Sequence, residues 1–279
     1  MTKIDTGTDD LLGRIDGHVA VLSFNRPERR NALSSSMYDG FGAALPQIER
    51  DPSVRVLMVT GEGGAFCAGG DVKGMHENNT SGGSAGAGSD ATSLEDRVAW
   101  LRSRQALVSL ALRQLPMPVV AALPGAAAGA GLSMALAADL RIAAERAVVV
   151  TAFANVGASG DFGTSWFLPR LVGEAKAKEL MFTSPRLTAA QAADLGIVNR
   201  VLPDAGFAEA ALEFCHDLAS RAPIALRYMK ENVNRALGST LAEALDAEAS
   251  AMVRTMGTAD HREAAAAFVE KRPPEFVGH

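Results

Sequence analysis

Residues 118–139 read PVVAALPGAAAGAGLSMALAAD, and no charged side chain occurs from Gln114 to Ala138. A run of that length could span a bilayer. However, it is interrupted by Pro116, Pro118, Pro124, Gly125, Gly129 and Gly131. We therefore expect a buried strand over 118–123, a turn over 125–131 and a buried alanine-rich helix that ends near Asp139, rather than a membrane span.

The sequence on both sides of this stretch alternates strand and helix patterns. An Asp16-Gly17 pair predicts the turn of a hairpin, and Ser34 or Ser35 is the expected N-cap of the helix that follows. From residue 184 onward the pattern is mainly helical. The expected elements are the hairpin at 14–24, helices at 35–49 and 94–115, and strands at 54–60, 140–143, 147–150 and 197–201. This order predicts an α/β core over residues 1–203 and a helical C-terminal region over 204–279.

Composition excludes several classes of protein. The chain has 279 residues, 48% hydrophobic and 21% charged, which is not typical of a disordered chain. A net charge of −5 lacks the basic footprint of a nucleic-acid binder. Two distant cysteines and five histidines without paired spacing predict neither a disulfide framework nor a metal site. The N-terminal MTKIDTGTDD has no apolar signal region, so we expect a cytoplasmic protein without a membrane partner.

Two loops place small residues where a strand ends. They are GEGGAFCAGGDVKG, residues 61–74, and the turn at the start of 124–139. Small side chains let a ligand approach backbone N–H groups, and the second loop also opens a helix, whose first N–H groups lack partners. Two such donors that converge on one oxygen form an oxyanion hole. Such loops are often plain turns, and the spacing of Gly125, Gly129 and Gly131 does not match a dinucleotide-binding fingerprint.

Five motifs occur in an order that resembles the crotonase (enoyl-CoA hydratase/isomerase) superfamily. They are NRPERRNALS (25–34), FCAGGDVK (66–73), the stretch 118–139, LTAAQAADLGIVNRVLP (187–203) and EKRPPEF (270–276). The resemblance covers nearly the whole chain. It implies a spiral of ββα units with a helical C-terminal part that forms trimers, often paired into hexamers.

The resemblance also implies site residues. The oxyanion N–H groups would belong to Gly70 and to Ala130, where the family usually has glycine, and Ala130 can serve only if its φ is negative. Together they would stabilise a thioester enolate. Without the resemblance, the charged side chains among the implied coenzyme A contacts would be read as solvated. Coenzyme A is part of the substrate, so no separate cofactor is expected. The implied contacts are Arg29, Arg30, Ala68, Asp71 and Lys73, with Phe268 and Lys271 reaching in from a neighbouring subunit.

The chain departs from the family's hydratases at two positions. Their two glutamates would fall on Ser133 and Phe153, and neither residue can act as a carboxylate base. One carboxylate remains, in NVGASGDFGTSWFLPRLVG (155–173), where Asp161 matches an aspartate of the family's double-bond isomerases. An alternative role for Asp161 is a turn or N-cap residue before a helix at Thr164. The aromatic residues Phe153, Trp166 and Phe167 would shape an acyl pocket or simply belong to the core.

Three functions remain open. The first is an enoyl-CoA double-bond isomerase in which Gly70 and Ala130 hold the enolate and Asp161 moves the proton. The second is an enoyl-CoA hydratase with a non-standard acid/base arrangement, in which Asp161, Glu77, Asp90 or Glu95 positions water. The third is a non-catalytic homologue that binds acyl-CoA or a partner.

Overall fold

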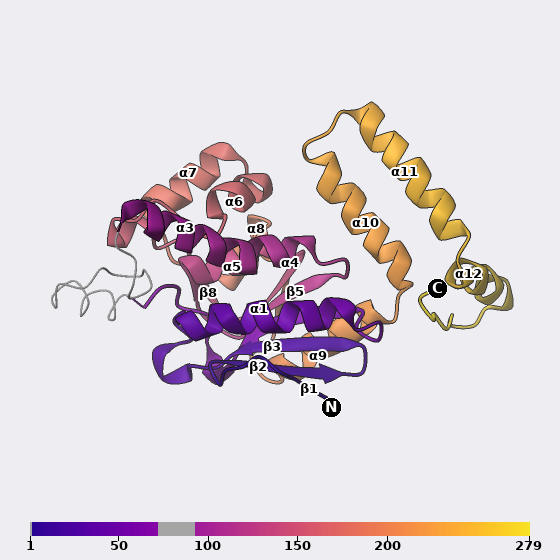
Figure 1. The fold of residues 1–279 in the computed structure, drawn as a ribbon, viewed down its shortest axis with the longest axis horizontal. Coiled ribbons are helices and arrows are strands. Elements are labelled where there is room, and N and C mark those ends of the chain that lie inside the picture. Colours follow the sequence, from indigo (N-terminus) through magenta and orange to yellow (C-terminus); the bar gives the residue numbers. More distant parts are fainter. Residues whose placement is uncertain (1, 72–92) are drawn as a thin grey trace.

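A seven-stranded sheet forms the centre of the molecule (Figure 1), in a computed structural model that describes residues 2–71 and 93–279. The strand order is β1-β2-β3-β4-β5-β7-β10. The first three strands pair antiparallel, and β3, β4, β5, β7 and β10 run parallel. The bounds are β1 Thr2–Ile4, β2 Leu11–Asp16, β3 Val19–Phe24, β4 Val56–Gly61, β5 Val119–Leu123, β7 Leu140–Ala144 and β10 Arg200–Leu202.

A second, small sheet has the order β6-β8-β9. Its strands are β6 Ala127–Ala128, β8 Val148–Val150 and β9 Leu187–Thr188. An isolated bridge joins Cys67 to Ala127 of β6. The small sheet therefore holds the two glycine-rich loops next to each other, and the two sheets confirm the predicted α/β class.

Helices surround the sheets. The helices of the first half are α1 Ser35–Arg50, α3 Leu94–Gln105, the π-helical η3 Ala106–Leu110, α4 Ala111–Gln114 and α5 Ala130–Ala137. Those of the second half are α6 Thr164–Val172, α7 Glu174–Thr183, α8 Ala189–Asp194, α9 Phe207–Ala219, α10 Pro223–Ala236, α11 Leu241–Met256 and α12 Ala259–Glu270. Short 3-10 turns lie at η1 Pro27–Arg29, η2 Glu62–Gly64 and η4 Ala154–Val156.

Alternate residues of the central strands face two separate cores. Ala20, Leu22, Leu57 and Val59 pack on the α1 side with Phe41 and the helix α5. The residues between them, among them Val19, Val21, Val56 and Met58, pack with Phe207, Ala211 and Cys215 of α9. Period-2 alternation is the expected pattern for strands covered on both faces. All eight residues of α5 are buried, so 118–139 forms a buried strand and a buried helix, as predicted.

The helices α10, α11 and α12 extend away from the sheets (Figure 1). One contact that holds α10 to the core is partly buried: Lys230 Nζ lies 2.7 Å from Asp139 Oδ2 and donates to Met117 O at 3.0 Å. The predicted boundary between residues 203 and 204 stays a prediction, although α9, which follows it, packs on the sheet. Within residues 2–71 and 93–279, no helix is long and apolar enough to cross a membrane.

Both cysteine thiols are fully buried, Cys67 beside α5 and Cys215 in α9. Burial raises the pKa of each thiol to about 12. Because the thiolate is the reactive form, we expect the native protein to resist Ellman's reagent and to release two thiol equivalents only after unfolding in guanidinium chloride. Fast titration of either thiol in the native protein would contradict this packing.

Candidate active site

The two glycine-rich loops lie side by side at the carboxyl ends of β4 and β5. The Ala128 N–H donates to Cys67 O at 3.0 Å, and the N–H groups of Phe66 and Cys67 both donate to Ala126 O. A Cβ atom on Gly131 would lie 2.4 Å from Cys67 O, so only glycine permits this approach. The ends of adjacent parallel strands are a common place for a ligand site.

The predicted oxyanion donors, Gly70 and Ala130, lie one on each of these two loops. The N–H groups of Gly70 and Ala130 donate to no residue that the structure describes. Ala130 is the first residue of α5, where a backbone N–H has no partner within the helix. Its φ lies outside the left-handed region, which meets the condition set for a non-glycine donor. A Cβ atom on Gly69 would lie 3.3 Å from Ala130 N, so the loop that carries Gly70 passes directly beside the start of α5.

Asp161 lies in the loop before α6 and is half-buried. Its Oδ1 accepts hydrogen bonds from Gln105 Nε2 at 2.6 Å and from its neighbour's N–H, that of Phe162, at 2.7 Å. The N-cap of α6 is Gly163, with no side-chain cap, so the carboxylate of Asp161 does not cap this helix. Burial raises the pKa of Asp161, and the two hydrogen bonds act in the opposite direction.

The two positions that carry glutamate in hydratases are buried and have no carboxylate here. Ser133 in α5 is fully buried, and its hydroxyl pairs with the hydroxyl of Thr164 and donates to Gly129 O at 3.1 Å. Phe153 is 8% exposed. The Thr164 N–H donates to Asp161 O at 3.2 Å, and the Thr164 hydroxyl lies 3.1 Å from the same oxygen. A chain of hydrogen bonds thus fixes the Asp161 loop relative to α5.

Tyr38 of α1 was not predicted as a site residue. Its ring stacks on that of Phe162, with 5.6 Å between centroids and 11° between planes. Burial, followed by the negative charge of Asp161 and then by Cys67, raises the pKa of Tyr38, so its phenol stays protonated. The stacking on Phe162 places Tyr38 beside the Asp161 loop. The sequence does not indicate that Tyr38 lies beside the Asp161 loop, because Tyr38 simply fits the amphipathic pattern of α1.

Trp166 and Phe167, two of the aromatic residues considered for an acyl pocket, have different surroundings from Phe162, the ring next to Asp161. Trp166 is 41% exposed, and its ring packs against the guanidinium of Arg170 at 3.8 Å. Phe167 belongs to the core beneath α6 and meets the Trp166 ring edge-on. Phe162, which is 1% exposed, is the ring that adjoins Asp161.

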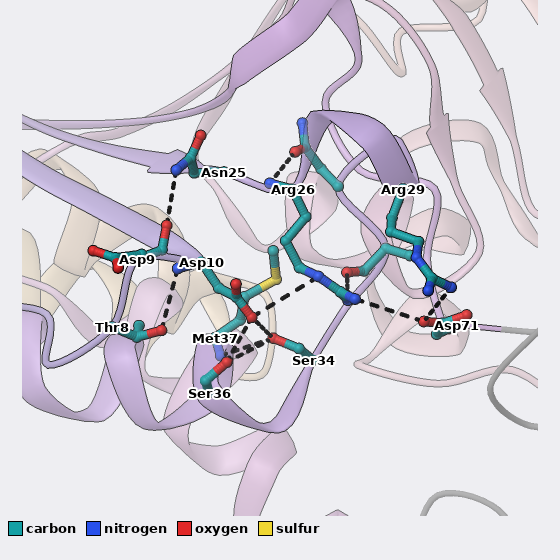
Figure 2. A network of polar contacts seen from close by, with 12 residues as sticks. Thr8, Asp9, Asp10, Asn25, Arg26, Arg29, Ser34, Ser36, Met37 and Asp71 are labelled. Atoms are coloured by element: carbon teal, nitrogen blue, oxygen red, sulfur yellow. Dashed lines mark hydrogen bonds and ion pairs between the residues drawn. The ribbon is translucent and has the colours of Figure 1, made fainter. Parts of the chain in front are cut away.

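A network of ion pairs fixes the segment 25–34 (Figure 2). The carboxylate of Asp10 accepts hydrogen bonds from Ser34 and Ser36, and the guanidinium of Arg26 lies between Asp10 at 3.9 Å and Asp71 at 3.8 Å. Arg29 lies 3.7 Å from the same Asp71 oxygen. Asp71 therefore orients two arginines, and Arg26 is a member of this cluster that the sequence reasoning missed.

The remaining predicted coenzyme A contacts fall into three groups. Arg30 is exposed, and its carbonyl accepts the Ala68 N–H at 3.0 Å, which joins the segment 25–34 to the first oxyanion loop. Lys73, like Glu77 and Asp90, lies outside the described residues. Phe268 lies on α12 and is 86% exposed, and Lys271 is the residue directly after that helix. In Figure 1, α12 is far from α5. One chain therefore does not bring these two residues to its own site.

Comparison with known proteins identifies this arrangement. Residues 14–279 match the family Enoyl-CoA hydratase/isomerase. The chain belongs to that family. It is 35% identical to 1,2-epoxyphenylacetyl-CoA isomerase of Escherichia coli over 96% of this chain and 98% of that protein. It is 33% identical to a short-chain-enoyl-CoA hydratase of Clostridium acetobutylicum over 93% of this chain and 94% of that protein.

Solved structures of the enoyl-CoA hydratase/isomerase family share the fold. An enoyl-CoA hydratase from Polaromonas sp. JS666 superposes with a TM-score of 0.86 at 35% identity, covering 96% of this chain and 99% of that one. One from Bacillus anthracis gives a TM-score of 0.84 at 32% identity, covering 97% and 100%. The fold and the recognition of the crotonase superfamily are thus confirmed, and the chain is an enzyme of the enoyl-CoA hydratase/isomerase family. Relatives at similar identity carry isomerase and hydratase names, so these names do not assign the reaction of this enzyme.

Proposed function

We propose that this enzyme moves the double bond of an enoyl-CoA thioester from C3 to C2. The N–H groups of Gly70 and Ala130 bind the thioester oxygen and stabilise the enolate charge as it develops. Asp161 removes a proton from C2 and returns one to C4. No water is added, so a single carboxylate suffices.

The observation that carries this proposal is that, of the three candidate positions for a base, Asp161, Ser133 and Phe153, only Asp161 has a carboxylate. Asp161 is tied to α5 through Thr164 and Ser133 and keeps its side chain free of helix capping. At the two hydratase positions the chain has a hydroxyl that already has partners and a buried phenyl ring. This arrangement favours proton transfer by one base over the addition of water by two glutamates.

Coenzyme A enters as part of the substrate, and we propose no separate cofactor. Arg29 and Arg30 present exposed cationic side chains beside the first oxyanion loop, where they suit the phosphates of coenzyme A. Asp71 pairs with Arg26 and Arg29 and would orient those two cations, and Lys73 and Ala68 complete the proposed contacts.

We also propose that the chain forms a homotrimer or a dimer of trimers, in which Phe268 and Lys271 contact coenzyme A in a neighbouring subunit. The support is the apolar surface of the extended C-terminal helices, which one chain leaves uncovered. Its exposed residues include Met229, Val233, Leu237, Leu241, Leu245, Met252, Val253, Phe268 and Val269.

The reaction is tested by incubating the wild-type enzyme with a 3-enoyl-CoA and, separately, with a 2-enoyl-CoA of the same chain length. Mass spectrometry after separation distinguishes an isomer of equal mass from a product that has gained water. We expect conversion of the 3-enoyl substrate to its isomer and no hydration of the 2-enoyl substrate. Hydration at a comparable rate would instead support a hydratase with a non-standard acid/base arrangement, and acyl-CoA binding without turnover would support the non-catalytic alternative.

A further inference from the structure

Among the described residues, the carboxylate of Asp161 has hydrogen-bond partners at one oxygen only. Oδ1 accepts two hydrogen bonds, from Gln105 Nε2 at 2.6 Å and from the Phe162 N–H at 2.7 Å. Oδ2 accepts none from the residues that the structure describes. The two oxygens of this carboxylate are therefore chemically different, and Oδ2 is the one available to exchange a proton.

Gln105 reaches Asp161 across 56 positions of the sequence, from the end of its helix. It is the last residue of α3, and the chain then makes a π turn, in which the Ala111 N–H bonds to Ala106 O, five residues back. Such turns are rare and frequently occur at functional sites. This one contains Ser109, whose hydroxyl is buried without a hydrogen-bond partner among the described residues. An unpaired buried hydroxyl costs stability, so the turn is not explained by stability alone.

We propose that Gln105 is a positioning residue, whose amide anchors Oδ1 of Asp161 so that Oδ2 alone carries the proton between carbon atoms of the substrate. This inference rests on the proposed function, in which Asp161 is the base. The amide donates to the charged form of the carboxylate, which keeps the base ionised, and it fixes the plane of the carboxylate, which aims Oδ2.

Among the described residues, two other ionisable groups of the site have raised pKa values. Tyr38 of α1 faces it with a raised pKa, and burial raises the pKa of Cys67 in the first oxyanion loop to about 12. Arg104 of α3 packs beside Tyr38 and forms an ion pair with Asp39 at 2.6 Å. Within the described part of the site, the rising limb of a pH profile therefore reports Asp161.

The test compares Gln105→Leu, which removes the donor, with Gln105→Glu, which keeps the shape but puts a second carboxylate against Asp161. Isomerisation of the 3-enoyl-CoA is measured from pH 4 to pH 9, with kcat and KM determined separately. Gln114→Leu and Gln114→Glu are matched controls, since Gln114 ends the next helical segment, α4, and is exposed. Thermal unfolding of each variant shows whether it is folded, and Asp161→Asn is measured in the same buffers.

For Gln105→Leu we expect the rising limb of kcat/KM to move to higher pH by about one unit. We also expect kcat to fall about tenfold with little change in KM, because a base that is no longer aimed affects turnover more than binding. The limb should move further for Gln105→Glu, because neighbouring carboxylates share one proton. Both Gln114 variants should match the wild type.

Wild-type kcat and pH profiles in both Gln105 variants, while Asp161→Asn is inactive, would overturn the role of Gln105 and leave the proposed function intact. Full activity of Asp161→Asn would instead overturn the proposed function. Should Gln105→Leu fail to fold, Gln105→Met, which keeps the length of the side chain but cannot donate, takes its place, because a merely structural amide predicts no shift of the rising limb when only the donor is lost.

Discussion

Replacing Asp161 with asparagine is expected to lower kcat for 3-enoyl-CoA isomerisation by about 10²–10⁴-fold, the usual contribution of a positioned acid or base. Asparagine keeps the shape, and its Oδ1 can still accept from Gln105 Nε2 and from the Phe162 N–H. The Gly70 and Ala130 donors are untouched, so binding of acyl-CoA should persist. Stopped-flow assays and calorimetric titration of a saturated acyl-CoA measure the two properties separately.

The pH dependence of this variant follows from the raised pKa of Asp161. The base must be ionised, so wild-type activity should fall as the pH decreases through that raised pKa, and the variant's residual rate should lack this limb. A carboxyl whose pKa is higher in the folded than in the unfolded state destabilises the native protein once the pH exceeds both values. Asp161→Asn should therefore unfold at no lower a temperature than the wild type at neutral pH, with any gain disappearing in acid. A marked loss of stability would show that Asp161 has a structural role instead.

Replacing Ala130 with proline is expected to lower kcat/KM by about 10²–10³-fold, the cost of removing one oxyanion donor. Only proline deletes a backbone N–H, and position 130 is the first residue of α5, where proline is tolerated because that N–H has no partner in the helix. Ala130→Gly is the matched control, since it keeps the N–H and should retain activity.

Circular dichroism and acyl-CoA binding show whether the Ala130 proline variant is folded. A folded variant that binds acyl-CoA and turns it over at the wild-type rate would exclude Ala130 as an oxyanion donor. Loss of activity in both variants would point to a need for the alanine methyl group, and not to the N–H.

Local signals in the sequence were sufficient to predict most of the strands and helices around the two glycine-rich loops. The Asp16-Gly17 turn joins β2 to β3, and Ser34 caps α1 by accepting the Met37 N–H. The expected strand at 197–201 begins only at Arg200, because the N–H groups of Ile197 and Val198 bond back to Ala192 O at the end of α8. Caps and tight turns depend on neighbouring residues, which a single sequence displays.

Contacts between distant segments were not predictable in the same way. Residues 94–115 read as one helix, whereas the structure contains a π turn that periodicity does not reveal. Gln105, the residue before that turn, bonds to Asp161, and Tyr38 comes from a third element, α1. The pairing of Asp71 with Arg26 and Arg29 also joins separate loops. The resemblance supplied candidate residues for the reaction, and tertiary packing determined which groups surround them.

The central claim, proton transfer by a single carboxylate without addition of water, is tested most directly by running the wild-type reaction in D₂O and locating the label by NMR. Proton removal at C2 and return at C4 predicts a 2-enoyl thioester that carries deuterium at C4, or no label where the same proton is returned. Deuterium at C2 beside a new hydroxyl group at C3 would mean that the enzyme adds water, and would contradict the account.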